Sequence, residues 1–229
     1  AIVLSPVAAG MASAGHQLTS GGVTRTYELI GATPGQLKPL VLALHGNLGT
    51  GAQLARYGSW SGIASRNGFV VALPEGLNRS WADGRNAGEI KGNKPPIGTD
   101  DVAFLSTLAD RLIADGLADR RRIYAAGVSN GGMMTYRLLC ERPDLFAAGA
   151  GIIAVMTEGA AARCKPGRPV PMLIMNGTDD RLLPYGRDGT YIGTEATAAV
   201  FRRLNGCGDA AETRAMPDAD PHDSSIVVR

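Results

Sequence analysis

A serine flanked by glycines is the first candidate for chemistry in this sequence. Gly127-Val128-Ser129-Asn130-Gly131 has the pattern G-x-S-x-G; it closes the apolar stretch 122–127 and opens a helical pattern over 131–141. A sharp strand-to-helix turn of this kind exposes a serine hydroxyl at the positive end of a helix. We therefore predict that Ser129 is a nucleophile. The alternative is a structural turn in a glycine-rich chain.

A second loop is expected to stabilise the negative charge that forms on the substrate oxygen during the attack. Leu44-His45-Gly46-Asn47 ends the apolar run 39–45. A loop in this place and the residue after the nucleophile give the two backbone donors of an oxyanion hole, each worth ~3 kcal/mol. We predict that the backbone N–H groups of Asn47 and Asn130 have this role. His45 is expected to hold the loop at the edge of the site and not to act as the base.

A pair of carboxylates follows a later apolar run. Asp179 and Asp180 come directly after the run 170–176 and the turn residues Gly177-Thr178. A carboxylate at the end of a strand after the nucleophile orients the histidine of a Ser–Asp–His set. Since the two residues are adjacent, only one of them can face the site. The alternative is a turn-capping pair.

The elements that must position these residues alternate along the chain. Short apolar runs indicate strands that are buried on both faces of a parallel sheet. They lie at 39–45, 69–74, 122–127 and 170–176. Helical patterns lie at 53–67, 102–117, 131–141 and 194–204, and Asp100 or Asp101 is placed to cap the second of them. The alternation predicts one doubly wound α/β domain over 16–229, with an antiparallel hairpin at 17–29 on the sheet edge.

Composition excludes several classes of protein. The 229 residues include 23 Lys plus Arg and 21 Asp plus Glu, so the formal net charge is only +2 and gives no electrostatic footprint for nucleic acid. No uninterrupted apolar run is long enough for a membrane span. No C-x-x-C pair occurs among the three cysteines, so zinc has no support, and we expect neither a metal nor an organic cofactor. Nothing in the sequence indicates an oligomeric state.

The two ends of the chain suggest export and an incomplete domain. Residues 1–15 are small and apolar, and Ala12-Ser13-Ala14 fits a signal-peptidase site, so we expect a signal-peptide remnant; a flexible terminus is the alternative. Three cysteines leave one thiol unpaired in an exported protein. The sequence therefore favours either a cytosolic protein with buried thiols or a secreted or periplasmic protein that lacks part of its chain.

The motifs together resemble a known family. The segment 127–133 (GVSNGGM), with LHG at 44–46, SWADGR at 80–85, TDDVAFL at 99–105 and NGTDD at 176–180, is similar to secreted polyhydroxybutyrate-depolymerase-like esterases. This LpqC-type group is related to bacterial feruloyl and acetylxylan esterases. The resemblance covers roughly residues 17–207. It implies an α/β-hydrolase fold with a mostly parallel sheet.

The resemblance also assigns roles to residues. It places the catalytic acid at Asp180 rather than Asp179, and it implies that Trp81 and His45 line the substrate site. Asn176 stands where the family has a histidine, which should not alter the chemistry. Asp83 and Arg85 belong to the family's segment near the acyl site. A disulfide between Cys140 and Cys164 is implied beside the nucleophile helix.

One departure concerns the general base. The family's catalytic histidine sits in a C-terminal segment that this sequence does not contain, so we expect the base, and a partner for Cys207, beyond Arg229. His222 follows Asp180 in the right chain order, but it precedes the apolar stretch 226–228 and lies on a polar loop. We expect it to be a solvated loop residue and not the base.

These features predict a serine carboxylic-ester hydrolase that works through an acyl-enzyme. The expected partner is a small or oligomeric ester of the polyhydroxybutyrate type. Alternatives within enzymes are a feruloyl, acetylxylan or aromatic polyester esterase, or a serine peptidase or acyltransferase on the same fold. The alternative from another class is a non-catalytic chain that binds acyl ligands, because it lacks the base.

Overall fold

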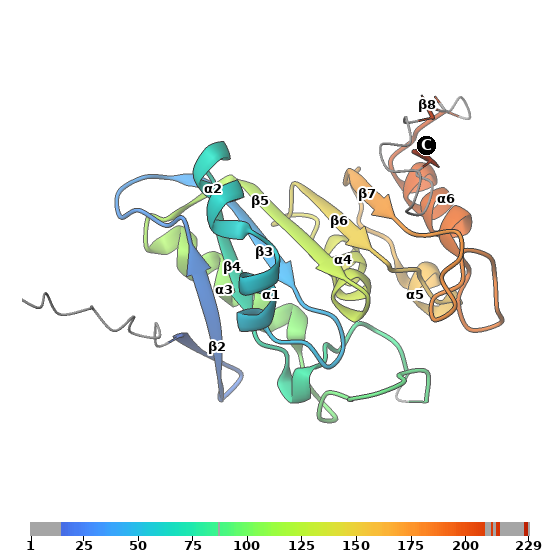
Figure 1. Ribbon diagram of the computed structural model, residues 1–229, viewed down its shortest axis with the longest axis horizontal. Helices are drawn as coiled ribbons and strands as arrows, with labels where there is room; N and C mark the ends of the chain where they lie inside the picture. Colours follow the sequence, from blue (N-terminus) through green and yellow to red (C-terminus); the bar gives the residue numbers. More distant parts are fainter. Residues whose placement is uncertain (1–14, 87, 209–211, 213, 216–226, 229) are drawn as a thin grey trace, which may run out of the picture.

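A seven-stranded, mostly parallel sheet forms the centre of the computed structural model (Figure 1). The structure describes residues 15–86, 88–208, 212, 214–215 and 227–228. The strands are β1 (His16–Ser20), β2 (Val23–Ile30), β3 (Lys38–Leu44), β4 (Val70–Pro74), β5 (Ala118–Val128), β6 (Ala148–Ile152) and β7 (Met172–Met175). Their order across the sheet is β1-β2-β4-β3-β5-β6-β7. The five strands from β4 to β7 run parallel, and β1 and β2 form the antiparallel edge hairpin that the sequence predicts.

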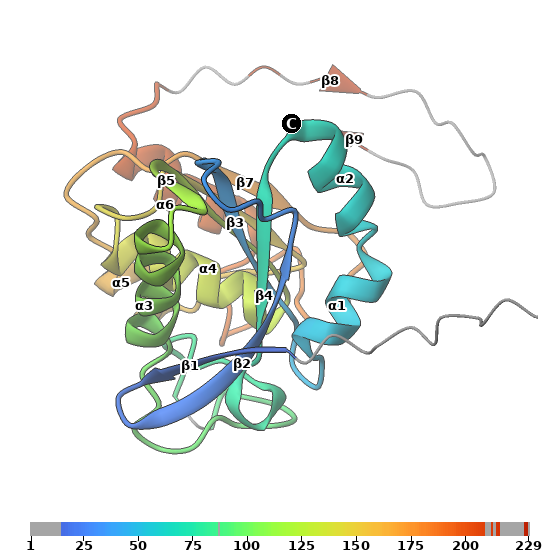
Figure 2. The same cartoon turned by 90° about the vertical axis from the view of Figure 1, so that its left-hand side faces the viewer.

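Helices cover both faces of this sheet. They are α1 (Gly51–Tyr57), α2 (Trp60–Asn67), α3 (Asp101–Ala114), α4 (Asn130–Glu141), α5 (Glu158–Arg163) and α6 (Thr194–Leu204), with a short 3-10 turn η1 (Leu77–Arg79). Figure 2 shows α1 and α2 on one side of the strands and α3, α4 and α5 on the other. The predicted doubly wound α/β arrangement is therefore confirmed.

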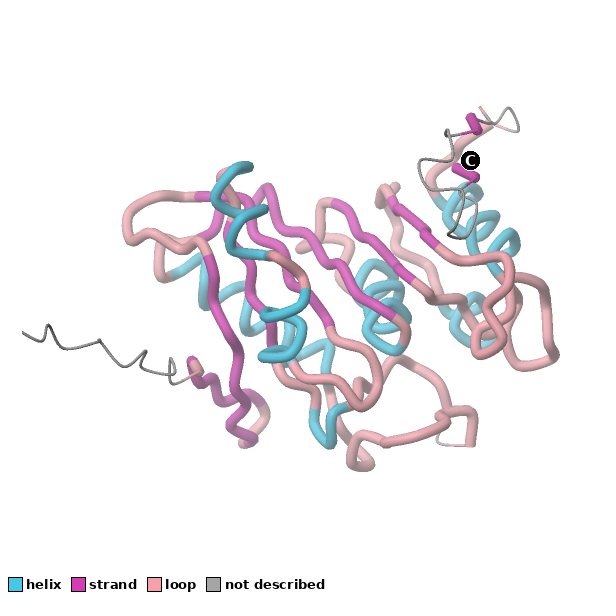
Figure 3. Tube along the Cα trace, in the orientation of Figure 1, coloured by secondary structure: helices cyan, strands magenta, loops and turns pink. Residues whose placement is uncertain are grey.

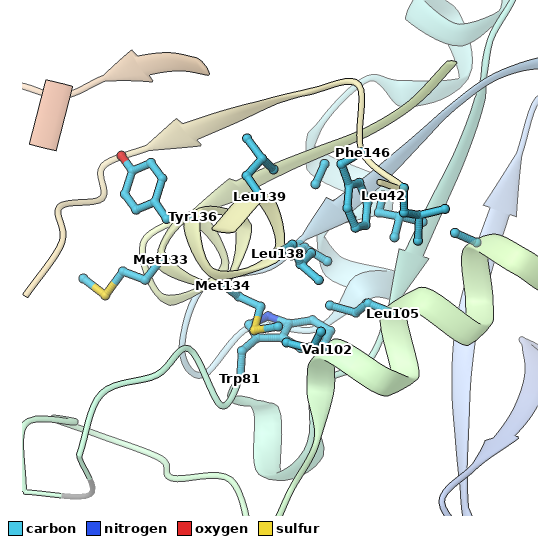
Figure 4. Packing of buried hydrophobic residues seen from close by; sticks show 14 of the residues in the cluster. Leu42, Trp81, Val102, Leu105, Met133, Met134, Tyr136, Leu138, Leu139 and Phe146 are labelled. Carbon is cyan, nitrogen blue, oxygen red and sulfur yellow. The ribbon is translucent and has the colours of Figure 1, made fainter. Parts of the chain in front are cut away.

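Side-chain alternation along the strands separates two apolar clusters. Leu40, Leu42 and Leu44 of β3 belong to the large cluster with α3 and α4, whereas Ala43 between them belongs to the cluster beneath α1 and α2. Successive strand residues point to opposite faces, so one strand serves both layers. Figure 4 shows Trp81 packed beside Met134 and Val102 in the large cluster. The core thus holds the start of α4 against the loop that follows β4.

The predicted helix 53–67 is two helices in the structure. Gly58 ends α1, and Ser59 has the left-handed φ of 49° before α2 begins. A Cβ atom built on Gly58 would lie 2.1 Å from the indole Nε1 of Trp60, so no side chain fits at the bend. Apolar periodicity continues through this break and does not reveal it.

Two elements have no strong signal in the sequence. Strand β6 has the sequence AGAGI, which contains no apolar run, and it lies between β5 and β7. A Cβ atom on Gly151 would lie 2.5 Å from the hydroxyl oxygen of Tyr136. A larger residue at this position in β6 would therefore collide with α4. The short helix α5 after it was not predicted either. Sequence patterns of strand hydrophobicity miss a strand built for close helix packing.

The described residues beyond α6 include a pair of short strands. β8 (Arg214–Ala215) and β9 (Val227–Val228) pair in an antiparallel manner, apart from the main sheet. The tube in Figure 3 shows the seven strands of the main sheet side by side, with helices over their faces. Residues 1–14, most of the expected signal remnant, lie outside the described residues. Within the part that is described, no helix has the length and apolar character of a membrane span.

Candidate active site

Ser129 occupies the turn between β5 and α4 in a strained backbone conformation. Its φ is 55° and its ψ is −121°, values that L-residues rarely adopt. Two backbone hydrogen bonds fix this turn: the Ser129 N–H donates to Ile152 O (2.8 Å), and the Met133 N–H donates to Ser129 O (3.0 Å). The hydroxyl has no hydrogen-bond partner among the described residues. Strain of this kind persists where the surroundings determine it, and it is concentrated at functional sites.

The glycines of the pentapeptide allow three segments to meet at this turn. A Cβ atom on Gly127 would lie 2.2 Å from Gly131 O, and one on Gly131 would lie 2.4 Å from Leu44 O. On the neighbouring loop, a Cβ atom on Gly46 would lie 3.4 Å from the Cβ atom of Ser129. The loop after β3 therefore lies directly against the candidate nucleophile, as the sequence predicts.

The backbone N–H groups of Asn47 and Asn130 have no acceptor among the described residues. Asn130 is the first residue of α4, where a backbone N–H has no acceptor within its own helix. The Asn47 N–H donates to no described residue, whereas the next residue, Leu48, donates to Arg79 O. The Asn47 side chain is held by Ser80 Oγ (2.9 Å) and Asn93 O (2.6 Å). Both loops that carry the predicted donors are thus anchored.

The side chain of Asn130 ties the start of α4 to the loop after β4. Its Oδ1 accepts the Trp81 N–H (2.8 Å), and its Nδ2 donates to Trp81 O (3.0 Å) and to Asp83 Oδ2 (2.5 Å). Asp83 is buried and forms a bidentate pair with Arg85, whose Nη1 donates to the Tyr191 hydroxyl. The asparagine next to the nucleophile is therefore fixed by a buried polar network.

A second buried pair holds the same loop from the hairpin side. Asp101 Oδ1 accepts from Arg25 Nη1 (2.5 Å), and its Oδ2 accepts the Ala82 N–H (2.6 Å). The Arg25 guanidinium lies 3.8 Å from the ring centroid of Phe104. At the start of α3, the Asp100 side chain accepts the Ala103 N–H, so of the two predicted cap residues Asp100 is the cap.

His45 and Trp81 make their contacts with the protein. The Nε2 of His45 accepts the Gly76 N–H (3.0 Å), so its Nδ1 carries the proton and donates to Gly46 O (2.8 Å). Burial lowers the pKa of His45 below its usual 6.5, which favours this neutral form. Trp81 is fully buried and donates its indole N–H to His45 O (2.8 Å). Both side chains therefore support the loop beside Ser129.

Asp180 and Asp179 follow β7 and differ in their surroundings. Asp180 is half-buried, and its Oδ1 accepts the N–H groups of Leu182 (2.8 Å) and Leu183 (2.9 Å). Its Oδ2 has no partner among the described residues, and Asp179 is exposed. Strands β5, β6 and β7 are parallel neighbours, so Asp180 and Ser129 both follow strand ends at the same sheet edge. Asn176, where the resembled family has histidine, bonds Ala154 and Thr194 in the same region.

The remaining predicted residues are placed as follows. Cys140 and Cys164 form a disulfide that joins the last turn of α4 to the end of α5, and Cys207 is free and exposed. His222 lies outside the described residues. His16, in the edge hairpin, stacks on Tyr27. In the described part of the chain, no group of three or more His, Cys, Asp or Glu side chains is placed to hold a metal ion.

Sequence reasoning did not find the residues that lock the loop 81–85. Arg137 donates to Ala82 O (2.5 Å) from α4, and Arg163 donates to Gly84 O (2.7 Å) from α5. The S-W-A-D-G-R segment pointed to this loop, but no local pattern pairs it with arginines more than 50 residues away along the chain. The signal for Arg163 is especially weak because α5 itself was not predicted.

The chain is similar in sequence to several proteins that are named as esterases. The family model described as "Prolyl oligopeptidase family" matches residues 61–160. The putative esterase NocK of Nocardia uniformis subsp. tsuyamanensis is 30% identical over 240 residues, which cover 96% of this chain and 68% of the relative. Feruloyl esterase B of Piromyces equi is 27% identical over 77% of this chain and 34% of its own length. The probable feruloyl esterase C of Aspergillus clavatus is 30% identical over 75% of the chain.

The chain spans about a third of the length of the first of these feruloyl esterases and 57% of the second. Solved structures agree on the fold. A thermostable esterase matches 83% of this chain and 50% of its own, with a TM-score of 0.59 and 23% identity. A phospholipase/carboxylesterase from Dyadobacter fermentans matches 79% of this chain and 83% of its own, with a TM-score of 0.60 and 19% identity. With the nucleophile turn, the sheet order and the identity to NocK together, the chain belongs to an esterase family of the α/β-hydrolase type.

Proposed function

We propose that this protein is a serine carboxylic-ester hydrolase that works through an acyl-enzyme. The observation that carries the proposal is the conformation of Ser129, with φ of 55° and ψ of −121° at a glycine-packed strand–helix turn. Such a turn presents a hydroxyl to a substrate carbonyl above the sheet. The esterase relatives support the same reaction class, and so does the open hydroxyl of Ser129.

In this proposal the backbone stabilises the charge that the attack creates. Ser129 Oγ bonds to the carbonyl carbon, and the carbonyl oxygen becomes an oxyanion that accepts from the Asn47 and Asn130 N–H groups. A histidine takes the serine proton and gives it to the leaving alcohol, which leaves an acyl-serine. Water then attacks the acyl-serine by the same route and releases the acid. Because both donor loops are anchored, they need little reorganisation during this step.

Asp180 is the proposed partner of that histidine. Its Oδ1 is occupied by two backbone N–H groups, which fix the carboxylate, and its Oδ2 has no partner in the described residues. An oxygen in this state can accept the imidazole N–H and hold its tautomer. Asp179 is exposed and has no such fixed geometry, which favours Asp180 of the pair.

The proposed base is a histidine outside the described residues. His45 uses both ring nitrogens to hold its loop, and His16 stacks on Tyr27 in the hairpin at the far edge of the sheet. We propose that His222 is not the base either, because Asp220, Pro221 and Asp223 around it are turn formers. The proposed roles of His45 and Trp81 are to support the oxyanion loop. Trp81 has no exposed surface with which to contact a substrate.

For the substrate we propose oligomeric hydroxyalkanoate esters of the polyhydroxybutyrate type, on the strength of the ordered motifs. Feruloyl or acetylated polysaccharide esters are the second candidate, since relatives named feruloyl esterase and acetylxylan esterase match this chain. The family-model match carries a peptidase name, but a fold does not fix the acyl donor. We further propose that the protein is secreted or periplasmic, where the disulfide Cys140–Cys164 would persist.

The reaction class is tested with p-nitrophenyl butyrate, with Ser129→Ala as the control. In a protein that carries the proposed base, we expect turnover with Ser129 in place and loss of it in the variant, together with labelling of Ser129 alone by a fluorophosphonate probe. Equal background rates for both proteins would favour the non-catalytic alternative. Initial rates on hydroxybutyrate trimer, methyl ferulate and acetylated xylan then separate the substrate candidates.

The exclusion of His222 has its own test. In a protein that carries the complete C-terminus, His222→Ala should leave turnover of p-nitrophenyl butyrate within about twofold of the parent protein, since a solvated loop residue carries no proton in the reaction. Removal of a true general base lowers the rate by roughly 10²- to 10⁴-fold. A loss of that size, with unchanged folding by circular dichroism, would make His222 the base of a Ser129–Asp180–His222 triad.

A further inference from the structure

A cavity beside α4 does not include Ser129 in its lining. It has a volume of about 440 Å³ and lies between the loop 82–99, the helix α4 and the segment from Val155 to Cys164. This volume falls within the ~300–1,000 Å³ that is usual for small-molecule sites. Met133, one turn into α4, is the lining residue nearest to the nucleophile in the sequence. Ser129 is therefore not part of the cavity wall, although Asp83 and Arg85, from the segment that the resemblance places near the acyl site, are.

The inner wall of the cavity is apolar and buried. Six of its apolar residues are at most 6% exposed: Ile90, Met133, Tyr136, Val155, Met156 and Cys164; the polar Asp83 and Thr157 are buried there as well. Figure 4 shows Met133 and Tyr136 projecting from α4 on the side away from Trp81. The Tyr136 hydroxyl donates to Ala154 O (2.9 Å), so the donor is already satisfied. Thioether sulfurs make favourable contacts with aromatic rings, and two methionines border this space.

The charges of the cavity are unbalanced. Four cations line it, and two of them are paired within the lining: Arg85 with Asp83 (2.6 Å) and Arg137 with Glu141 (2.7 Å). Lys94 and Arg163 have no carboxylate partner among the described residues. Both are exposed, as is Ile97, so they lie at the solvent side of the apolar wall. The site thus combines an apolar interior with two uncompensated positive charges.

We propose that this cavity binds an aromatic monocarboxylate, separately from ester cleavage at Ser129. The ring occupies the wall formed by Met133, Tyr136 and Met156, and the carboxylate meets Lys94 and Arg163 at the entrance. Charge complementarity selects an anion over its neutral analogue, and the apolar wall selects an aromatic acid over acetate. The proposal does not depend on Ser129 being a nucleophile.

The test is a ligand-observed NMR titration of the full chain with 3-phenylpropanoate, with 3-phenylpropanamide and acetate as comparison ligands. We expect saturable binding of one 3-phenylpropanoate per chain, and binding at least about tenfold weaker for the amide and for acetate. Ser129→Ala should bind the acid as the wild type does. Failure of the wild type to bind saturably, or equal binding of acid and amide, would overturn the proposal.

Two pairs of matched variants locate the ligand. Lys94→Glu should weaken binding about tenfold or more, whereas Lys91→Glu makes the same charge change on a nearby exposed lysine that does not line the cavity, and should bind within twofold of the wild type. Ala160→Trp fills the cavity from α5 and should abolish binding. Ala162→Trp, on the same helix but outside the lining, should not. Equal effects within either pair would place the ligand elsewhere and refute the site.

Discussion

At the scale of single residues, the site depends on positions where no side chain fits. Gly131 is the second residue of α4, after Asn130, and it faces the carbonyl oxygens of Leu44 and His45 at the end of β3. The contact partners are backbone atoms, which cannot rotate away as a side chain can. The separation between the two proposed oxyanion donors is therefore set by the absence of a Cβ atom.

Gly131→Ala is predicted to lower kcat/KM for a soluble ester by roughly 100-fold, because a shift of about 1 Å in a catalytic group has this effect. Its Cβ atom would lie 2.4 Å from Leu44 O, so α4 or the end of β3 must move. Gly62→Ala in α2 is the control, since its Cβ atom would meet only the flexible end of Arg66. Activity in Gly131→Ala equal to that of Gly62→Ala would contradict the role given to this contact.

His45 predicts a pH dependence of stability. Burial lowers the pKa of its imidazole in the folded state below 6.5, so at low pH the unfolded chain binds the proton more readily. The contribution of His45 is thus complete above pH 6.5 and is lost as the pH falls from 6.5 towards the folded-state pKa. Urea denaturation at about pH 8 and about pH 5 should show a smaller decline in unfolding free energy for His45→Gln than for the wild type. An equal decline would show that His45 titrates alike in both states.

At the scale of elements, the sequence predicts those parts whose signal is local. The strands β3 and β4 are apolar runs, α6 has its predicted bounds, and Ser129 lies at the strand–helix turn that its pentapeptide indicates. Strand β6 escapes prediction because its glycines admit Leu139 and Tyr136 of α4. The break at Gly58–Ser59 escapes because the pattern of apolar residues runs through it. Contacts made in three dimensions therefore decide the elements that sequence patterns miss.

The same limit applies to the candidate site. The motifs indicate Asn47 and Asn130 as the proposed backbone donors, but they do not indicate the asparagine side-chain contacts that anchor both loops. Asn130 meets Asp83 across 47 residues of chain, and a single sequence holds no sign of such a pairing. The resemblance indicated the D-G-R segment, and the structure adds that its carboxylate holds the residue after the nucleophile.

The disulfide gives a prediction about α4 and α5. Cys140 and Cys164 close a loop with a sequence separation of 24, for which chain entropy gives ~3 kcal/mol of stabilisation. The double variant Cys140→Ser/Cys164→Ser should lose about this much unfolding free energy in urea. Cys207→Ser removes a free, exposed thiol and should change it by less than ~0.5 kcal/mol. Equal stability of the two variants would contradict the structural role of the disulfide.

At the scale of the whole molecule, buried polar groups connect the edge hairpin to the nucleophile helix. Arg25 of β2 reaches Asp101 at the start of α3, and Asp101 holds the loop at Ala82. The same loop reaches Asn130 through Trp81 and Asp83. Three segments, in β2, α3 and α4, thus meet around one loop beside Ser129.

Variants of the ion pair Arg25–Asp101 test how much unfolding free energy depends on this connection. Both side chains are at most 3% exposed, so removal of either partner leaves an uncompensated buried charge, at a cost of about 3–5 kcal/mol in unfolding free energy. Asp101→Asn and Arg25→Met should each show this loss, and the double variant should lose clearly less than the sum, with a coupling of about 0.5–3 kcal/mol. Asp115→Asn breaks the exposed pair with Arg111 after the same helix and should lower the unfolding free energy far less than either buried change. Urea denaturation of the two single variants and the double variant gives the double-mutant cycle, and Asp115→Asn is its control. Additive losses for the two single changes would mean that Arg25 and Asp101 act independently, and that the hairpin is not joined to the site through them.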